Sequence, residues 1–467
     1  MHRAIPGQVH FIGICGRAQG AVALELARRG LRVTGSDQGT FGEMPERLRA
    51  GGLAFFEKYE AGNIPVGVEH VVIGAYCKRG NPEVEQVLDE RISYSSFPRF
   101  LGDFVLGRGR NLVIAGTNGK TTTTAMLTWM LETAGLAPDY LIGGEARNLP
   151  GMARFAEAAL CVLEGDEYPS GLGDPAPKFL HYAPDLLGIT NIAHDHVDIF
   201  ATDAQYRQLF YEAVKILPGR GQLFLNADDA ACRELAGKRE GAVWVGFGKH
   251  ATRRITGWQQ RAGEMRFRFM EHELRLPGLG RMNAFNASLA AAMAVEAGAP
   301  WDAIEHALAT FQGVKGRLEP FYASPELLVI EDEGYHPNAI AEVVGGLKRR
   351  YPGRRLVVVL QPRYTGGAEG PFQRDLSAAL EGAGLVLIGY PADFAMSGPA
   401  FSRPRLCADL EKRGIEAVEV PFMRDMDAAL LERLRPRDVV LLTVAYKNEP
   451  FLNRLRESLP AWSPCAS

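Results

Sequence analysis

Seven consecutive residues have the types and the spacing needed to bind a phosphate group. They follow a short apolar stretch and precede a predicted helix, and they are Gly116, Thr117, Asn118, Gly119, Lys120, Thr121 and Thr122. Such a turn points backbone N–H groups at an anion, at the positive end of a helix dipole. Lys120 can reach the β- and γ-phosphates of a nucleotide, and the Thr121 hydroxyl can bind Mg²⁺. Ile114 replaces the first glycine of the strict P-loop pattern. The sequence therefore predicts a shortened phosphate loop, which we favour over a simple glycine turn with a surface lysine.

A second glycine-rich turn follows the first apolar stretch of the chain. Its glycines have the spacing G-x-x-G-x-x-x-G, and the next predicted strand ends in an acidic residue; the residues are Gly13, Gly16, Gly20, Ser36 and Asp37. A carboxylate at that place can bind ribose hydroxyls, so the pattern indicates a nucleotide-bearing ligand. The spacing differs from the G-x-G-x-x-G of NAD- and FAD-binding turns, which argues against a dehydrogenase. The alternative is a turn that uses glycine only for tight packing.

Acidic residues and histidines after two further apolar stretches could bind a metal ion. Residues 164–167 (EGDE) follow one stretch, and residues 194–198 (HDHVD) follow another. Carboxylates beside bound phosphates suit Mg²⁺, whereas histidine taken alone favours a transition metal. Strand ends of an α/β sheet are where ligands bind, so next to a phosphate loop a metal site is favoured over a solvated acidic loop.

These groups need strands that alternate with helices to position them. We predict strands at 9–13, 31–35, 70–75, 111–115, 160–163, 186–190, 222–225 and 243–245, and helices at 18–29, 82–89, 120–134 and 283–297. The alternation predicts βαβ units and parallel sheets, hence an α/β fold. Residues 266–276 alternate apolar and charged side chains, which predicts an antiparallel arm. Strands at 327–331, 355–360, 385–389, 417–421 and 439–444 predict a second doubly wound sheet.

The composition excludes several classes of protein. The chain has 467 residues, with 52 Lys plus Arg against 55 Asp plus Glu, so its net charge is −3. That balance argues against a protein that grips nucleic acid by neutralising phosphates. Six scattered cysteines without a C-x-x-C pair argue against a disulfide scaffold and favour a reducing compartment. No apolar stretch approaches the roughly 18 residues of a membrane helix, and the start of the chain lacks a signal-peptide pattern.

Together these motifs resemble the Mur ligase family of cell-wall peptide ligases over nearly the whole chain. The resemblance is carried by GTNGKTT (116–122), Glu164, NIAHDHVD (191–198), Asn283 with Asn286, and GRLE (316–319). GICGRAQG (13–20) and GSD (35–37) look like the subgroup whose first domain binds UDP-N-acetylmuramate. KRGNPEVEQVL (78–88), FLGDFVL (100–106), EGDEY (164–168) and KFLHYAP (178–184) look like the murein peptide ligases of peptidoglycan recycling. The subgroup that adds L-alanine is the runner-up.

The resemblance implies an α/β fold of three domains. Residues 1–108 would form a Rossmann-like domain for the UDP-sugar, residues 109–318 a central P-loop ATPase domain with a small antiparallel arm, and residues 319–467 a Rossmann-like domain for the acceptor. The implied enzyme uses ATP and Mg²⁺ to phosphorylate the lactyl carboxylate of UDP-N-acetylmuramate. The amine of a peptide, expected to be L-alanyl-γ-D-glutamyl-meso-diaminopimelate, then attacks the acyl phosphate. We expect a cytoplasmic monomer or weak homodimer, without a nucleic-acid partner or membrane insertion.

The resemblance also implies roles for single residues. Catalysis would depend on Lys120, Glu164, His196 and Arg317. ATP would be bound by the seven residues of the phosphate turn with Asn286, Arg317 and Asp332, and Mg²⁺ by Thr121, Glu164 and His196. The UDP-sugar would lie at Gly13, Gly16, Gly20, Ser36 and Asp37, and the acceptor near His336 and Arg363. Tyr211 stands where other branches of the family carry a carbamylated lysine. The two muramate-binding subgroups also lack that lysine, so Tyr211 fits them.

The chain departs from the family pattern in and near the third domain. Met282 and Tyr335 each replace a histidine, and residues 445–449 (AYKNE) replace a glycine-rich run. Residues 361–365 (QPRYT) look closer to the alanine-adding subgroup. The identity of the amine acceptor is therefore the part of the predicted function left open, and an amine other than the tripeptide is an alternative. A nucleotide-binding protein without ligase activity is the alternative from a different class.

Overall fold

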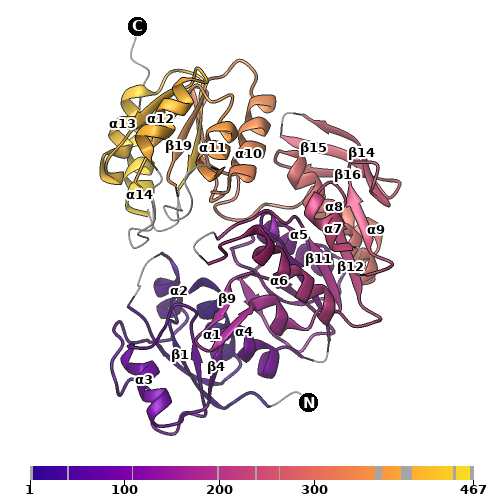
Figure 1. Cartoon of the computed structure of the whole chain (residues 1–467), viewed down its shortest axis with the longest axis vertical. Coiled ribbons are helices and arrows are strands. Elements are labelled where there is room, and N and C mark those ends of the chain that lie inside the picture. Colours follow the sequence, from indigo (N-terminus) through magenta and orange to yellow (C-terminus); the bar gives the residue numbers. More distant parts are fainter. Residues whose placement is uncertain are drawn as a thin grey trace.

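The structure, a computed structural model, describes residues 4–38, 42–107, 109–196, 199–236, 239–261, 263–362, 371–390, 402–444 and 449–462. Figure 1 shows three α/β units in chain order, from indigo through magenta and pink to yellow. Each unit has one main sheet, and each sheet takes its strands from one of the three predicted domains. The α/β class is confirmed, while the boundaries near residues 108 and 318 stay predictions. In the described ranges no helix is both long and apolar enough to cross a membrane.

The first domain has a four-stranded parallel sheet with the order β2-β1-β3-β4. Its strands are β1 (Gln8–Ile12), β2 (Arg32–Ser36), β3 (His70–Ile73) and β4 (Tyr94–Ser96), and its α-helices are α1 (Arg17–Arg28), α2 (Met44–Ala50), α3 (Pro82–Asp89) and α4 (Phe97–Phe100). A π-helical turn, Leu101–Val105, follows α4. Helix α3 has the predicted bounds because Asn81 caps it: its side chain accepts the N–H of Glu83, and Pro82 occupies the first turn.

The central domain has a sheet of ten strands with the order β16-β15-β14-β13-β12-β11-β5-β8-β6-β7. The strands are β5 (Arg110–Ala115), β6 (Asp139–Leu141), β7 (Ala153–Arg154), β8 (Leu160–Glu164), β11 (Leu186–Ile189), β12 (Gln222–Asn226), β13 (Val243–Gly246), β14 (Arg253–Gln260), β15 (Glu264–Phe269) and β16 (His272–Pro277). Strand β5 lies between β11 and β8, parallel to both. Strands β14 to β16 form the predicted antiparallel arm, in which β14 is an additional strand. A separate hairpin joins β9 (Pro169–Gly171) and β10 (Asp174–Pro177).

Helices cover both faces of the central sheet because the side chains of β5 alternate. Leu112 and Ile114 face a buried cluster with α5 (Lys120–Thr133), α8 (Arg281–Glu296) and α9 (Trp301–Ala309). Val113 and Ala115 face a second cluster, which includes α6 (Asp203–Ile216) and much of the first domain. Helix α7 (Ala230–Ala236) packs beside β12.

The third domain has a six-stranded sheet with the order β17-β18-β22-β19-β20-β21. The strands are β17 (Glu319–Ala323), β18 (Leu327–Glu331), β19 (Leu356–Leu360), β20 (Leu385–Ile388), β21 (Glu416–Glu419) and β22 (Asp438–Thr443), and all but β17 run parallel. Helices α10 (Pro337–Arg350), α11 (Pro371–Ala379) and α12 (Arg403–Glu411) cover one face, and α13 (Met426–Arg433) and α14 (Glu449–Ser458) the other. The doubly wound sheet is as predicted, and β17 is an additional antiparallel edge strand.

Candidate active site

The phosphate turn between β5 and α5 needs glycine at two positions. Gly116 and Gly119 have φ angles of +127° and +85°, a region that residues with a Cβ rarely adopt. A Cβ on Gly119 would also lie 2.7 Å from Oδ1 of Asn286. The turn therefore brings its backbone closer to its neighbours than any side chain would permit.

Residues after β11 hold the phosphate turn in place. The Thr117 hydroxyl donates to the carbonyl of Ala193 at 2.9 Å, and the Ala193 N–H donates back to the same hydroxyl. The N–H of Asn118 donates to Oδ1 of Asn191 at 3.1 Å, and Thr190 Oγ1 donates to the Asn118 carbonyl at 2.7 Å. The turn is thus fixed before any ligand binds.

Lys120 lies inside the site and is paired with Glu167, one of the acidic residues 164–167, to which the family resemblance gave no role. Its Nζ donates to the Gly116 carbonyl at 2.6 Å and to Oε2 of Glu167 at 2.8 Å, and the two side chains are only 11% and 2% exposed. Burial alone would lower the pKa of Lys120, but the charges of Glu167 and Asp166 raise it. Burial would likewise raise the pKa of Glu167, but Lys120 and His196 lower it to about 2. Both groups are therefore charged at neutral pH.

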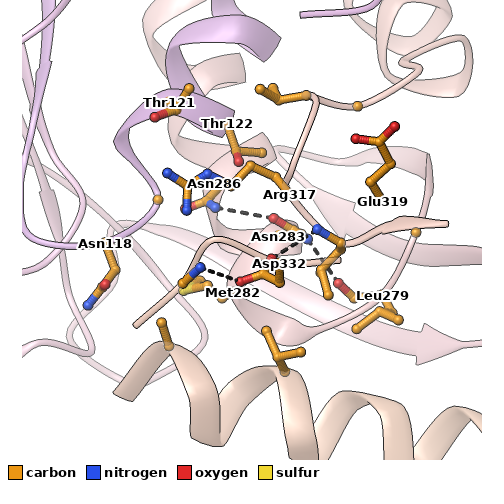
Figure 2. Close-up of a pocket in the computed structure, with 18 of the residues that line it drawn as sticks. Asn118, Thr121, Thr122, Leu279, Met282, Asn283, Asn286, Arg317, Glu319 and Asp332 are labelled. Carbon is orange, nitrogen blue, oxygen red and sulfur yellow. Dashed lines mark hydrogen bonds between the residues drawn. The ribbon is translucent and has the colours of Figure 1, made fainter. Parts of the chain in front are cut away.

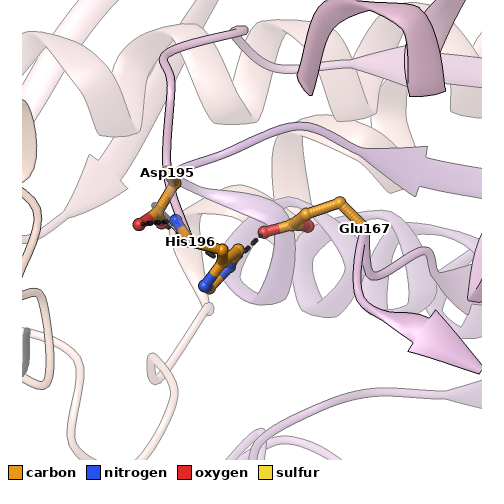
Figure 3. A group of neighbouring side chains, drawn as sticks. All are labelled: Glu167, Asp195 and His196. Atoms are coloured by element: carbon orange, nitrogen blue, oxygen red, sulfur yellow. Dashed lines mark hydrogen bonds and ion pairs between the residues drawn. The ribbon is translucent and has the colours of Figure 1, made fainter. Parts of the chain in front are cut away.

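Glu167, Asp195 and His196 form a compact group of possible metal ligands (Figure 3). His196 Nε2 lies 2.8 Å from Oε1 of Glu167, and Oδ1 of Asp195 accepts the His196 N–H at 2.7 Å. Within the described ranges no other set of three acidic, histidine or cysteine residues is gathered this closely. Burial would lower the pKa of His196, but its hydrogen bond to Glu167 and the charge of Asp195 raise it.

Of the predicted metal ligands, Thr121 and Glu164 pair with each other, apart from the His196 group. Thr121 Oγ1 donates to Oε1 of Glu164 at 2.8 Å, and the Gly143 N–H donates to Oε2 at 2.6 Å. Burial and the charge of Asp166 raise the pKa of Glu164, while the charge of Lys120 lowers it, so a further cation beside the carboxylate would favour its charged form. The oxygen-rich surroundings fit Mg²⁺. The predicted ligands Thr121, Glu164 and His196 thus all line one cavity but belong to two separate groups, and their binding of Mg²⁺ stays a prediction.

A cavity of about 560 Å³ extends from the phosphate turn to the third domain (Figure 2). Its lining includes Lys120, Glu164, Glu167 and His196 together with the predicted ATP residues Asn286, Arg317 and Asp332. Such a volume suits a nucleotide-sized ligand. The structure thus brings these distant residues to one cavity, while their roles in binding ATP stay predictions.

Two residues of the cavity wall show how it could hold a nucleotide. Asn286 donates to Oδ1 of Asn283 at 3.3 Å, while its own Oδ1 is buried without a hydrogen-bond partner in the structure described. A buried acceptor of this kind fits a ligand N–H. The Asp332 carboxylate accepts the N–H groups of Leu318 and Gly334 at 2.9 and 2.8 Å, which fixes it beside Arg317 (Figure 2). Burial raises the pKa of Asp332.

The residues that depart from the family pattern also lie at this cavity. Met282 and Tyr335 line it. The Tyr335 hydroxyl donates to Oδ2 of Asp195 at 2.9 Å, so the third domain contacts the possible metal ligands directly. The predicted acceptor residue His336 caps α10 by accepting the Asn338 N–H at 3.2 Å. Arg363 and residues 445–448 lie outside the described residues.

The glycine-rich turn of the first domain is closed by Asp37. Oδ2 of Asp37 accepts the N–H of Cys15 at 2.9 Å, and Oδ1 accepts the Tyr59 hydroxyl at 3.1 Å. Gly13 has a φ of +86°, and Gly16 is the N-cap of α1. A Cβ on Gly20 would lie 2.6 Å from Met44, so this glycine serves helix packing.

Ser36 is fully buried and donates to the buried carboxylate of Glu83. The structure thus places Ser36 inside the first domain, and its predicted sugar-nucleotide contact stays untested. A nearby contact that the sequence missed joins the first and third domains. Arg17 follows Gly16 and binds both carboxylate oxygens of Glu333 at 2.9 and 3.2 Å, and Arg317 lies 3.7 Å from the same carboxylate.

Comparisons with known proteins agree with this arrangement. The model of the Mur ligase middle domain matches residues 114–294, and that of the Mur ligase family, catalytic domain, matches residues 8–108. The UDP-N-acetylmuramate–L-alanyl-γ-D-glutamyl-meso-2,6-diaminoheptandioate ligase of Haemophilus influenzae is 32% identical over 387 residues, which are 82% of this chain and 85% of that protein.

Two solved structures share the architecture. A murein peptide ligase of Psychrobacter arcticus is 25% identical with a TM-score of 0.71, over 97% of this chain and 98% of that one. A UDP-N-acetylmuramate–alanine ligase of Thermotoga maritima has a TM-score of 0.80 over 98% and 100% of the two chains. At 23% identity, this second likeness is one of fold.

Proposed function

This chain belongs to the Mur ligase family, and we propose that it is an ATP-dependent ligase that joins UDP-N-acetylmuramate to the amine of a peptide. The observation that carries the proposal is the buried Lys120–Glu167–His196 group at the phosphate turn, inside a cavity shared with the third domain. The peptide we favour is L-alanyl-γ-D-glutamyl-meso-diaminopimelate, which is in the name of the Haemophilus influenzae relative. We place the enzyme in the cytoplasm as a monomer or weak homodimer, without nucleic acid.

Phosphoryl transfer would take place at the phosphate turn. A carboxylate oxygen of the sugar nucleotide attacks the γ-phosphorus, the bond from that phosphorus to ADP breaks, and an acyl phosphate forms. Lys120 is already charged, buried and held by the turn, so it can stabilise the transferring group without reorganising. Arg317 would add a second positive charge from the domain boundary.

Mg²⁺ would be held by Thr121 with Glu164 and by Glu167 with His196. It would neutralise charge on the phosphate oxygens during the transfer. The residues present fit such an ion because Thr121 Oγ1 and the Glu164 carboxylate offer oxygen ligands that lie 2.8 Å apart. Glu167 and Asp195 join the metal ligands inferred from the sequence on the basis of their position.

The amine would attack the acyl phosphate from the side of the third domain. Its nitrogen bonds to the carbonyl carbon, phosphate leaves, and the amine gives up a proton. Tyr335 and His336 approach the central domain from that side, at Asp195 and at the His194 carbonyl. The cavity between the domains would exclude water, which otherwise hydrolyses the acyl phosphate.

L-alanine is the second candidate acceptor. The fold match to an alanine ligase covers 98% of this chain, and two residues that differ from the family pattern, Met282 and Tyr335, line the cavity. One assay separates the two acceptors. The protein is given ATP, Mg²⁺ and UDP-N-acetylmuramate with L-alanine, with the tripeptide, or with a longer peptide. Phosphate release and product mass are then measured.

We expect phosphate release only with all substrates present and a mass that corresponds to the tripeptide adduct. Lys120→Met should lower the turnover by about 100- to 1000-fold, the range found for removing one preorganised charge partner. Lys215→Met, which removes an exposed surface lysine, is the matched control and should leave turnover unchanged. Binding of ATP and sugar nucleotide without an amide product for any amine would contradict a ligase function.

A further inference from the structure

The hairpin of β9 and β10 belongs to the central domain but packs on the first. Ser96 of the first domain donates to Oδ2 of Asp174 in β10 at 2.5 Å. Leu172, between the two strands, packs against the buried first-domain cluster that contains Val71 and Ile73. Gly171 lies so close to Ala75 that a Cβ on it would be 3.4 Å from the Ala75 Cα. Strand β9 contacts α4, and Figure 1 shows the two side by side. The segment that follows the active-site carboxylates is therefore fixed to the sugar-nucleotide domain.

Lys178 directly follows this hairpin and is held close to the active site. Its Nζ donates to Oδ2 of Asp166 at 2.8 Å, and the side chain is 19% exposed. The ammonium lies 5.8 Å from the ring centre of Tyr168, whose ring in turn lies 4.1 Å from that of His196. Asp166 and Tyr168 both line the cavity of the phosphate turn. Lys178 is thus a second, partly buried cation, in contact with residues that line the cavity and next to the first domain.

The proposed reaction needs such a cation. The carboxylate of the sugar nucleotide must approach the γ-phosphoryl group to about 3–3.5 Å, although both are anions. Lys120 is held in the phosphate turn by the carbonyls of Gly116 and Thr117, so it serves the nucleotide. In the structure as described, the Lys178 ammonium has one hydrogen-bond acceptor, Asp166, and an ammonium has three N–H groups to donate. Two of them remain for a ligand.

We propose that Lys178 binds the lactyl carboxylate of the sugar nucleotide and holds it for attack on the γ-phosphorus. This inference rests on the proposed function and adds a residue to it. Asp166 keeps the ammonium charged and oriented. The hairpin ties the position of Lys178 to the first domain, where the nucleotide end of the same substrate would bind. One substrate would then be held at both ends by groups whose separation is fixed by the packing of the two domains.

The test compares two sugar nucleotides that differ in the group Lys178 would bind. UDP-N-acetylglucosamine lacks the lactyl carboxylate of UDP-N-acetylmuramate. Calorimetry would give the dissociation constants of both for the wild type, Lys178→Met and Lys178→Arg. We expect the wild type to prefer UDP-N-acetylmuramate. Lys178→Met should weaken its binding by about 10- to 100-fold and leave UDP-N-acetylglucosamine unchanged. Lys178→Arg keeps the charge and should retain most of the preference.

The outcomes separate this inference from the proposed function. If Lys178→Met lowered the affinity for both sugar nucleotides equally, the lysine would only hold the hairpin. If it lowered neither affinity, the lysine would not bind the substrate. Either result overturns this inference and leaves the proposed function standing. A wild type that binds neither sugar nucleotide overturns the proposed function and this inference together. Circular dichroism and ATP affinity of each variant show that the fold and the phosphate turn are intact.

Discussion

The central domain packs against its two neighbours in different ways. Towards the first domain, one apolar cluster continues across the boundary: Phe11 of β1 belongs to the same buried cluster as Val113 of β5 and Phe155 after β7. Helix α1 also contacts β7. The two domains share a core that water does not enter.

Towards the third domain, the contacts are mostly polar. In the described residues, the two buried clusters of the third domain take only Leu279 from outside it. The remaining links include Arg17 with Glu333, Tyr335 with Asp195, and Arg350, which donates to the Gly278 carbonyl at 3.1 Å.

The difference indicates which parts of the site move. Apolar contacts are lost to water at a large cost, whereas polar contacts at a boundary can be exchanged for water at little cost. The first and central domains should therefore act as one body that keeps the glycine-rich turn of the first domain and the phosphate turn at a fixed separation. The third domain should be the part that opens and closes. Four predictions test this comparison.

Phe155→Ala should have the largest effect on stability. Phe155 is 1% exposed and lies in the shared core, so its truncation should lower the free energy of unfolding by about 3–5 kcal/mol. Because the core is shared, hydrogen exchange should show the first and central domains losing protection together. Phe451→Ala is the matched control, since Phe451 is equally buried in a cluster that the third domain forms alone. It should expose only the third domain, and loss of protection throughout the chain would contradict the comparison.

Breaking the contact between Arg17 and Glu333 should have a moderate effect. Glu333 is 7% exposed and Arg17 39%, so we expect a coupling energy of about 1–2 kcal/mol. Arg17→Ala and Glu333→Gln should each favour the open arrangement and increase the radius of gyration in X-ray scattering. The double variant should have a radius of gyration no larger than that of either single variant. Additive effects would show that the two residues act separately.

Glu331→Gln should have the smallest effect, and it should depend on pH. Burial, with the charges of Glu319 and Glu333, raises the pKa of Glu331 from 4.5 to about 7. The folded chain keeps this proton to about pH 7, but the unfolded chain loses it near pH 4.5. The wild type therefore becomes less stable as the pH rises from about 4.5 to about 7, and this destabilisation reaches its full size above pH 7. The variant should gain about 1 kcal/mol at pH 8 and much less at pH 5, measured by thermal unfolding.

A buried carboxyl of the first domain supplies the opposite case. Burial would raise the pKa of Glu83, but hydrogen bonds from His10, Ser36 and Asn63 lower it. Its charge therefore stabilises the fold above about pH 4.5, and this contribution is lost as the pH falls further. Glu83→Gln should thus destabilise the protein at both pH 5 and pH 8. If Glu83→Gln and Glu331→Gln changed the free energy of unfolding at pH 8 in the same direction, the electrostatic distinction between the two regions would be wrong.

Much of the fold could be predicted because its signals are local. The glycines of the phosphate turn have φ angles that other residues avoid, and Asn81 with Pro82 begins α3 where its sequence pattern does. The alternation of the arm, residues 264–277, is readable because one face packs and the other is solvated. Strands β14 and β17 were missed because neither has a clear alternation: β14 is mostly polar, and β17 is a partly exposed edge strand.

The sequence by itself determined the phosphate turn, the α/β class and the end of the sheet where acidic side chains gather. It could not decide which carboxylate meets which partner. Glu164 turns to Thr121 and Gly143, while Glu167, three residues further on, reaches His196 and Lys120. Glu164 ends β8 and Glu167 follows it closely, so their spacing alone does not show which partner each one meets. The tertiary structure also brought Arg17 to Glu333 and the β9–β10 hairpin to the first domain. These contacts join residues far apart in the chain, and they form only once the sheets have packed.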